Sequence, residues 1–513
     1  MERRDVAAAL GLVAFVLAIY LLTGPGRMDS MDVQLRFEVA RGLLERGAPV
    51  LQDGAQLRAR YVFEGVGGHN YSVYSAGGSL AGLPLVALGS WLGGESGDGQ
   101  LGLMRVLFSW TSGVAGALIP ALLFGAWRSL GVPRRAAAAW ALVAAFATLA
   151  WPVSCSGFEQ SQQSLLLLGA TLAAWRAGGA DGSRALAWVI LGGLCGAALI
   201  NYQEAYFLFL PLAAAACWSP KRPPIAALRR AVVFLFVALY LGAGCWMIWN
   251  RVRSGDALDS GKWFEGGGDV FGNPLVGVPG LLVSPGKGAL WYSPPVLLAL
   301  AGLPGLWRRS RPLALSTALS AAGMIVVFGA LSFFGADRCW GPRLTLAALT
   351  LLALALPFVV WPRWLVAGIV AAGVGVQGLA LSMDHHRFFN ERALEPLFYL
   401  DDPGFYFRES ALLARPGEAL DAAWGGVGPE VTKFARSPYP RDVTYPPVMF
   451  IHAEQAPALM ADFAVHQLPR PWPLWAPRLP EGLRYPAPVA PLLAGLMGLA
   501  AAGAGLLGWG IRR

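Results

Sequence analysis

Runs of about 20 apolar residues recur along nearly the whole chain, and no other feature of the sequence constrains its fold as strongly. A helix of that length crosses the hydrocarbon core of a bilayer, where each backbone N–H and C=O must find its partner inside the protein. Of the 513 residues, 56% are hydrophobic and only 14% are charged, which is more apolar surface than a soluble core needs. The sequence therefore predicts an all-α polytopic membrane protein.

About twelve transmembrane helices are expected from these runs. One further run, at 77–93, is short, rich in glycine and contains Pro84, so we treat it separately as an interfacial or re-entrant segment on the outer side of the membrane. The expected spans are 6–23, 101–127, 136–153, 161–176, 185–200, 203–218, 228–250, 288–307, 313–334, 343–361, 364–382 and 487–510.

The distribution of basic residues orients these spans. If 77–93 does not cross, all the strongly basic short connections fall on the side of the N-terminus, as the positive-inside rule requires of the cytoplasmic side. Both chain ends are then cytoplasmic, and the formal charge of +9 reflects membrane topology rather than binding to nucleic acid. The residues concerned are Arg3, Arg4, Arg128, Arg134, Arg135, Lys221, Arg222, Arg229, Arg230, Arg308, Arg309, Arg311, Arg363, Arg512 and Arg513.

The long polar segments all fall on the opposite, outer side, so we expect the chemistry there. They are the first loop at 24–100, the segment 251–287 and a tail at 383–486. No metal site is indicated, because the adjacent His385 and His386 have no third ligand nearby. Cys155 and Cys339 both fall in outer loops, where they either form a disulfide or remain thiols.

The first outer loop offers the candidate catalytic group. Its stretch "DVQLRFEVARGLLERG" alternates apolar and charged residues as a helix at a membrane surface does, with Asp32 at its start. Asp32 serves there either as a general base or only as the N-cap of the helix. Arg36, one turn later, shares its face and either binds phosphate or forms an exposed pair with Asp32.

Other charged residues stand at the outer ends of spans, where charge is costly. Glu159 and Glu204 face a cavity or cap their helices. Lys287 lies in the tight turn "SPGKG", whose glycines allow a close approach to a ligand, although the spacing is not that of a P-loop. Arg338 and Arg343 oppose the positive-inside trend, and either a lipid-linked phosphate or ordinary phospholipid headgroups explain them.

Taken in order, several segments between about residues 5 and 385 resemble the GT-C fold glycosyltransferases. The branch nearest in pattern is that of the protein O-mannosyltransferases and the lipid A aminoarabinose transferases. The segments are an acidic residue followed by "QLRFEVARGLLERG", then "YSVYSAGGSLAGLPLVALG", "LMRVLFSWTSGVAGALIPALLFGAWRSLG", "SPGKGALWYSPP" and "WGPRLTLAALTLLALALP".

The resemblance implies an enzyme that takes a sugar from a polyprenyl phosphate and transfers it, with inversion, on the outer face. It implies that the catalytic acid is Asp32, with Asp29 as the second choice. Many relatives carry a lysine for the lipid phosphate where this chain has Val73. The phosphate must then be held by other cations, with Arg36, Lys287, Arg338 and Arg343 as candidates, while Glu159, Glu204 and Tyr74 are assigned to the substrate.

We therefore expect a GT-C-like catalytic module at 1–385, an outer segment at 386–486 and a final span with a basic end at 487–513. The expected partners are a polyprenyl-phosphate sugar, an acceptor that is a lipid, a glycan or a protein, and membrane lipids, but no nucleic acid. No cofactor is required, although a divalent metal is compatible. The expected location is a bacterial inner membrane, and the alternatives are a flippase for lipid-linked sugars or an oligosaccharide ligase or polymerase.

Overall fold

The computed structural model describes residues 2–24, 30–51, 61–93, 98–261, 271–336, 339–382, 404–424 and 489–512. Nearly all the regular structure in this part of the chain is helical, with one small antiparallel hairpin. The hairpin pairs β1 (Val62–Glu64) with β2 (Asn70–Ser72), around a 3-10 turn at Val66–Gly68.

The α-helices of the first half of the chain are α1 (Arg3–Thr23), α2 (Met31–Arg46), α3 (Ala76–Leu92), α4 (Asp98–Ser109), α5 (Thr111–Ser129), α6 (Arg134–Phe146), α7 (Ala150–Cys155), α8 (Gln160–Gly179), α9 (Gly182–Ile200), α10 (Leu210–Ala214) and α11 (Pro224–Ser254). Those of the second half are α12 (Pro274–Val283), α13 (Ala289–Tyr292), α14 (Val296–Arg309), α15 (Arg311–Gly329), α16 (Leu346–Leu352), α17 (Arg363–Ser382), α20 (Phe405–Arg408), α21 (Ala411–Trp424) and α24 (Val489–Ile511). The 3-10 helices η2 (Glu204–Leu208), η3 (Ala215–Cys217), η4 (Arg343–Thr345) and η5 (Ala353–Phe358) adjoin α10 and α16.

Seven of the described helical segments are long and apolar enough to cross a membrane, so the chain is a multi-pass membrane protein. They are Arg3–Thr23, Gln100–Ser129, Gly182–Ile200, Pro224–Ser254, Arg311–Gly329, Arg363–Ser382 and Leu493–Ile511. The expected span 161–176 lies in α8, an uninterrupted helix of 20 residues that is not among these seven, and the remaining expected spans coincide with shorter or interrupted helices. The run 288–307, for example, is split into α13 and α14 at Ser293–Pro295, because proline lacks the N–H that a continuous helix needs.

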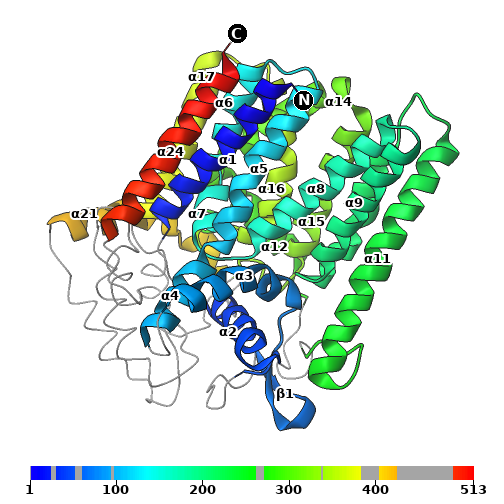
Figure 1. Cartoon of the computed structure of the whole chain (residues 1–513). Coiled ribbons are helices and arrows are strands. Elements are labelled where there is room, and N and C mark those ends of the chain that lie inside the picture. The colour runs from blue at the N-terminus through cyan, green and yellow to red at the C-terminus, as the bar shows by residue number, and fades with distance from the viewer. Residues whose placement is uncertain are drawn as a thin grey trace.

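Both chain ends lie at one end of the helix bundle, which we call the terminal end. The helices α2, α3 and α4 and the β-hairpin gather at the opposite, distal end (Figure 1). The segment 77–93 forms α3, which packs against α2 and α4 there and is shorter than a full span. Its side chains Leu80, Leu88 and Trp91 are exposed, and Trp91 reaches 76% exposure.

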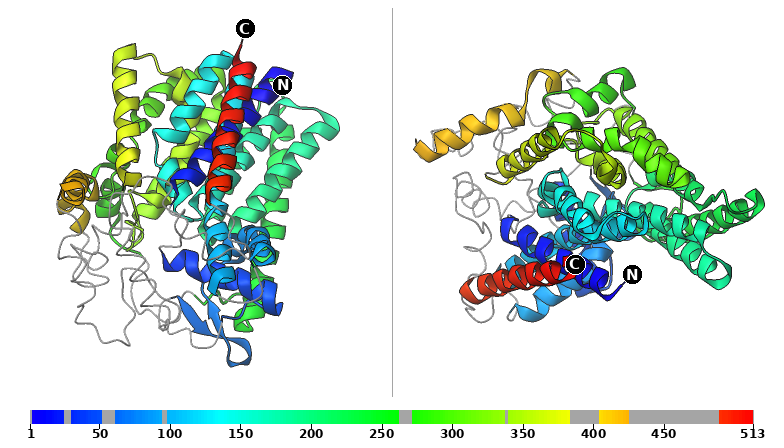
Figure 2. Two further views of the ribbon diagram at one scale, coloured as in Figure 1. Left: turned by 60° about the vertical axis from the view of Figure 1, so that its left-hand side comes forward. Right: turned by 90° about the horizontal axis from the view of Figure 1, so that it is seen from above.

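The first and last described helices, α1 and α24, pack side by side (Figure 2). A Cβ added at Gly503 would lie 2.5 Å from the backbone nitrogen of Phe15, and one at Gly11 would lie 2.4 Å from that of Leu507. Small residues at a helix crossing allow this backbone approach, which is how helices associate within a membrane.

We expect Gly503→Ala to lower the thermal unfolding temperature of the detergent-purified protein. The added methyl group would enter the α1 backbone, and such overpacking costs about 1–3 kcal/mol. Gly505→Ala is the matched control, since its Cβ meets nothing within 4 Å and both changes gain the same helix propensity. Equal unfolding temperatures for the two variants would contradict the close packing of α1 on α24.

Candidate active site

The start of α2 places Asp32 at the distal end of the bundle. Ser30 is the N-cap of this helix, because its hydroxyl accepts the backbone N–H of Val33. The alternative that Asp32 is the N-cap is therefore wrong, and its carboxylate in the first turn remains available for other contacts.

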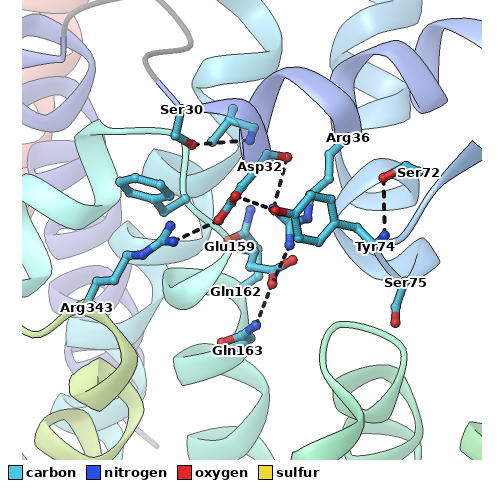
Figure 3. A network of polar contacts seen from close by, with 12 residues as sticks. Ser30, Asp32, Arg36, Ser72, Tyr74, Ser75, Glu159, Gln162, Gln163 and Arg343 are labelled. Atoms are coloured by element: carbon cyan, nitrogen blue, oxygen red, sulfur yellow. Dashed lines mark hydrogen bonds and ion pairs between the residues drawn. The ribbon is translucent and has the colours of Figure 1, made fainter. Parts of the chain in front are cut away.

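Two groups from distant segments bind the Asp32 carboxylate (Figure 3). The Nη2 atom of Arg343 lies 2.8 Å from Oδ2, and the phenol of Tyr74 donates to Oδ1 at 2.5 Å. The side chains of Asp32 and Arg343 are 15% and 8% exposed, so this ion pair is poorly hydrated. The structure thus brings together three residues that the sequence analysis assigned to catalysis, phosphate binding and substrate binding.

Arg36 lies beside this pair but bonds to other groups than expected. Its guanidinium donates to the backbone carbonyl of Asp32 at 3.0 Å, forms an ion pair with Glu159 at 2.8 Å and covers the Tyr74 ring at 4.1 Å. Arg36 is buried rather than exposed on the polar face of a surface helix, so the alternative of an exposed pair with Asp32 is wrong. The helix is buried here because α3 packs across it.

Glu159 connects Arg36 to polar groups deeper in the bundle. Gln163 donates to its Oε1 at 2.9 Å, and Tyr206 donates to Gln163 at 3.1 Å. Gly78 lets α3 approach this group, since a Cβ there would lie 2.6 Å from Cδ of Arg36 and 3.2 Å from Oε2 of Glu159. Burial of Glu159 is therefore offset by an ion pair and a hydrogen bond, as a buried carboxylate requires.

The turn before η4 holds Arg343 in position. Its Nε donates to the carbonyl of Ala336 at 2.9 Å, and its guanidinium covers the ring of Phe158 at 4.0 Å. Ala336 has a positive φ of 52°, which is uncommon for a residue with a Cβ. The Ala336 carbonyl thus binds the same guanidinium that pairs with Asp32.

Lys287 forms hydrogen bonds with the backbone of the same turn. Its ammonium is fully buried and donates to the carbonyls of Cys339 at 2.7 Å and Gly341 at 3.3 Å. The glycines of the "SPGKG" turn allow a close approach of another segment of the same chain, since the backbone N–H of Gly286 donates to the carbonyl of Tyr406 at 2.9 Å. Lys287 thus contacts the backbone that carries Arg343.

Glu204 and Arg253 hold the backbone around Tyr74 in place, and the sequence analysis did not single out Arg253. Glu204 accepts hydrogen bonds from Ser75 at 3.4 Å and from Trp246 at 3.2 Å. Arg253, buried at the end of α11, donates to the carbonyls of Ser72 and Tyr74. Arginine at an outer span end is the signal that identified Arg343, and it applied equally to Arg253.

Some predicted residues lie outside the described part of the chain, namely Asp29, Arg338, His385 and His386. Cys155 and Cys339 are free thiols rather than a disulfide. Within the described ranges, no group of three or more His, Cys, Asp and Glu side chains is arranged to hold a metal ion.

The surroundings of Asp32 set its charge state. Burial raises the pKa of the carboxyl, but the charges of Arg343 and Arg36 and the hydrogen bonds from Tyr74 and Arg343 outweigh it, so the pKa lies below its usual 3.8. Burial and the charge of Asp32 raise the pKa of Tyr74 well above 10. At neutral pH the site therefore holds an ionised carboxylate and a protonated phenol.

We expect Arg343→Gln to reverse the pKa shift of Asp32, because burial then meets less opposing charge. In the wild type, the lowered pKa of Asp32 stabilises the folded state above about pH 4, and this contribution is lost in acid. In the variant, a raised pKa means that the ionised carboxylate destabilises the folded state until it is protonated at lower pH. The unfolding-temperature gap between the wild type and the variant should therefore narrow from about pH 7 to about pH 4.5. In an Asp32→Asn background the effect of Arg343→Gln should not vary with pH, and a constant gap in both backgrounds would argue against the coupling.

No protein-family model and no curated protein sequence matches the chain. It is similar in structure to ArnT from Cupriavidus metallidurans in the apo state, with 16% identity, a TM-score of 0.44 and coverage of 99% of this chain and 76% of that one. It is also similar to the oligosaccharyltransferase AglB from Archaeoglobus fulgidus in complex with an inhibitory peptide and a dolichol-phosphate, with 13% identity and a TM-score of 0.41.

The AglB comparison covers 93% of this chain and 63% of the AglB chain, so this chain spans less than two thirds of that protein. ArnT is a lipid A aminoarabinose transferase, and both proteins have the GT-C fold.

Proposed function

We propose that this protein is an inverting glycosyltransferase that moves a sugar from a polyprenyl-phosphate donor to an acceptor on the outer face of a bacterial inner membrane. The observation that carries the proposal is the half-buried Asp32 carboxylate, held between Arg343 and Tyr74 with Arg36 beside it. This arrangement provides a base and two cations in one poorly hydrated place, which is what displacement of a phosphate-linked sugar requires.

In the proposed reaction the acceptor hydroxyl attacks the anomeric carbon of the donor. The new bond from the hydroxyl oxygen to that carbon forms as the bond from the carbon to the phosphate oxygen breaks. The hydroxyl proton passes to Asp32, and the polyprenyl phosphate leaves with the electron pair. A single displacement from the opposite face inverts the anomeric carbon, and the leaving phosphate needs cations rather than an acid.

The low pKa of Asp32 in the structure makes it a weak base, and the ion pair suggests how donor binding changes this. A donor phosphate competes with the carboxylate for Arg343, since guanidinium binds phosphate with two parallel hydrogen bonds. Once Arg343 turns to the phosphate, burial dominates at Asp32 and its pKa rises. Donor binding would thus activate the base at the place where the acceptor arrives.

The position of the site supports a lipid-borne donor. Helix α3 contacts Arg36 through Gly78 on one side and exposes Leu80, Leu88 and Trp91 elsewhere. Exposed leucines and a tryptophan on a helix at the end of a membrane bundle suit the boundary between headgroups and acyl chains. A polyprenyl chain can therefore lie in the membrane while its phosphate reaches the cations.

The distribution of arginines supports the assignment of the distal end to the outer side. Arg128, in the last turn of α5, and Arg134, at the start of α6, pair with Asp5 near the N-terminus. Arg135 donates to the carbonyl of Ile511 near the C-terminus. The basic connections thus gather at the terminal end, which the positive-inside rule assigns to the cytoplasm.

We expect Asp32→Asn to trap the donor, because the phosphate cations remain while the base is lost. General-base catalysis contributes about 10²–10⁴-fold to a rate, so donor turnover should fall by that order. The measurement is mass spectrometry of lipid extracted from the purified protein, in which the variant should carry more intact polyprenyl-phosphate sugar than the wild type. Asp256→Asn, an exposed change in the loop after α11, should behave as the wild type.

Arg343→Gln should act in the opposite direction and reduce the retained donor by about tenfold, because one charge-assisted contact to the phosphate is lost. The same extraction measures it, with Arg251→Gln as a control at an exposed arginine of α11. Nearly normal transbilayer movement of the lipid-linked sugar by Asp32→Asn would instead indicate the flippase alternative. A bound lipid-linked oligosaccharide would indicate a ligase or polymerase.

A further inference from the structure

A second concave site lies at the terminal end of the bundle, opposite Asp32. It has a volume of about 1060 Å³ and lies among the turn between α8 and α9, the turn between α14 and α15, and the segment after η3. Figure 1 shows these turns at the same end as the two chain termini. The residues that define this cavity are Ser129, Trp175, Arg176, residues 178–184, Trp188, residues 218–220 and residues 307–312.

The charge of this cavity is strongly positive. Its lining contains five arginines, whereas the one acidic residue among the described lining residues is Asp181. Asp181 already pairs with Arg222, so it does little to neutralise the cavity. The side chains of Arg184, Arg308, Arg309 and Arg311 are exposed, and each is therefore able to reach an anion in the cavity.

The positive-inside rule explains why arginines lie at this end but not why five of them surround a cavity. Other arginines of the terminal end have protein partners, as Arg128 and Arg134 show with Asp5, and Arg230 shows with the carbonyls of Gly178 and Ala180. The five cavity arginines flank two turns around one hollow, with Arg176 and Arg184 beside the turn between α8 and α9, and Arg308, Arg309 and Arg311 beside the turn between α14 and α15. Of these, Arg176 also donates to the hydroxyl of Ser129. Such clustering suits a multivalent anion such as a phosphate ester.

The apolar surroundings indicate that the anion belongs to a lipid. Trp188, Trp218 and Trp307 line the cavity and are 38%, 41% and 43% exposed, as suits indoles at a membrane interface. Trp188 and the exposed Leu191 follow Arg184 along α9 at intervals of four and three residues, so they lie on the same face of the helix as this arginine.

We propose that this cavity binds the headgroup of an anionic phospholipid of the cytoplasmic leaflet. The arginines contact the phosphate, the tryptophans lie at the level of the glycerol, and an acyl chain follows the exposed apolar face of α9. This lipid is neither donor nor acceptor for the proposed transfer, because its site lies at the other end of the bundle. Basic pockets between membrane helices on the cytoplasmic side are suited to such headgroups.

The test uses the full chain in detergent, with native mass spectrometry after addition of phosphatidylglycerol, cardiolipin or phosphatidylcholine. We expect the wild type to retain the two anionic lipids and not phosphatidylcholine. Arg308→Gln with Arg311→Gln should reduce the retained anionic lipid by about tenfold. Arg184→Gln, on the other rim of the cavity, should give a loss in the same direction, and it provides a second variant if the pair unfolds.

The matched control is Arg229→Gln with Arg363→Gln, which removes the same charge from two exposed arginines outside the cavity lining. Retention as in the wild type is expected there. Equal loss in the control pair, or equal retention of phosphatidylcholine, would overturn the proposal in favour of general charge attraction. Inorganic phosphate that raises the unfolding temperature as much as the anionic lipids do would equally overturn it, because the site would then bind a soluble anion.

Discussion

The ion pair between Asp32 and Arg343 joins segments that lie 311 residues apart in the chain. It ties the first turn of α2 to the start of η4, and so connects the helices at the distal end to the second half of the helix bundle. Because the pair is poorly hydrated, removal of either partner would leave the other charge without its main counter-charge. Other contacts at the distal end surround this ion pair. Tyr74 donates a hydrogen bond to the second oxygen of the Asp32 carboxylate, and Arg36 and Glu159 form another ion pair beside it. Lys287 donates to the backbone just before Arg343.

The two buried pairs together carry no net charge, which allows them to remain ionised in a poorly hydrated place. That balance also makes the site sensitive to an added anion. A phosphate that pairs with Arg343 leaves the Asp32 carboxylate without its strongest counter-charge, so binding and base strength are coupled through one guanidinium. In the proposed transfer, this coupling would keep the carboxylate ionised at rest and make it a stronger base when the donor is bound.

Sequence periodicity and charge predicted much of the fold, and the structure adds the breaks within it. The expected spans at 6–23, 185–200 and 364–382 match α1, α9 and α17 to within a few residues, because an uninterrupted apolar run of that length has few other structures in a membrane. The run 288–307 is instead interrupted at two prolines, and the apolar helix α12 was missed inside a segment treated as a loop. Hydropathy measures the composition of a window, whereas prolines and glycines decide whether the backbone continues through it.

The sequence by itself determined that the chain crosses a membrane many times, that its basic turns gather on one side, and that Asp32, Arg36 and Arg343 are unusual where they stand. These follow from the cost of polar and charged groups in hydrocarbon, which acts on each segment separately. Only the tertiary structure decided which charges meet. Arg36 pairs with Glu159 rather than with the carboxylate one turn away, Lys287 bonds to backbone carbonyls, and Arg343 reaches Asp32. Such pairings depend on how distant segments pack together, and the local sequence around each residue does not specify which side chains will lie near it.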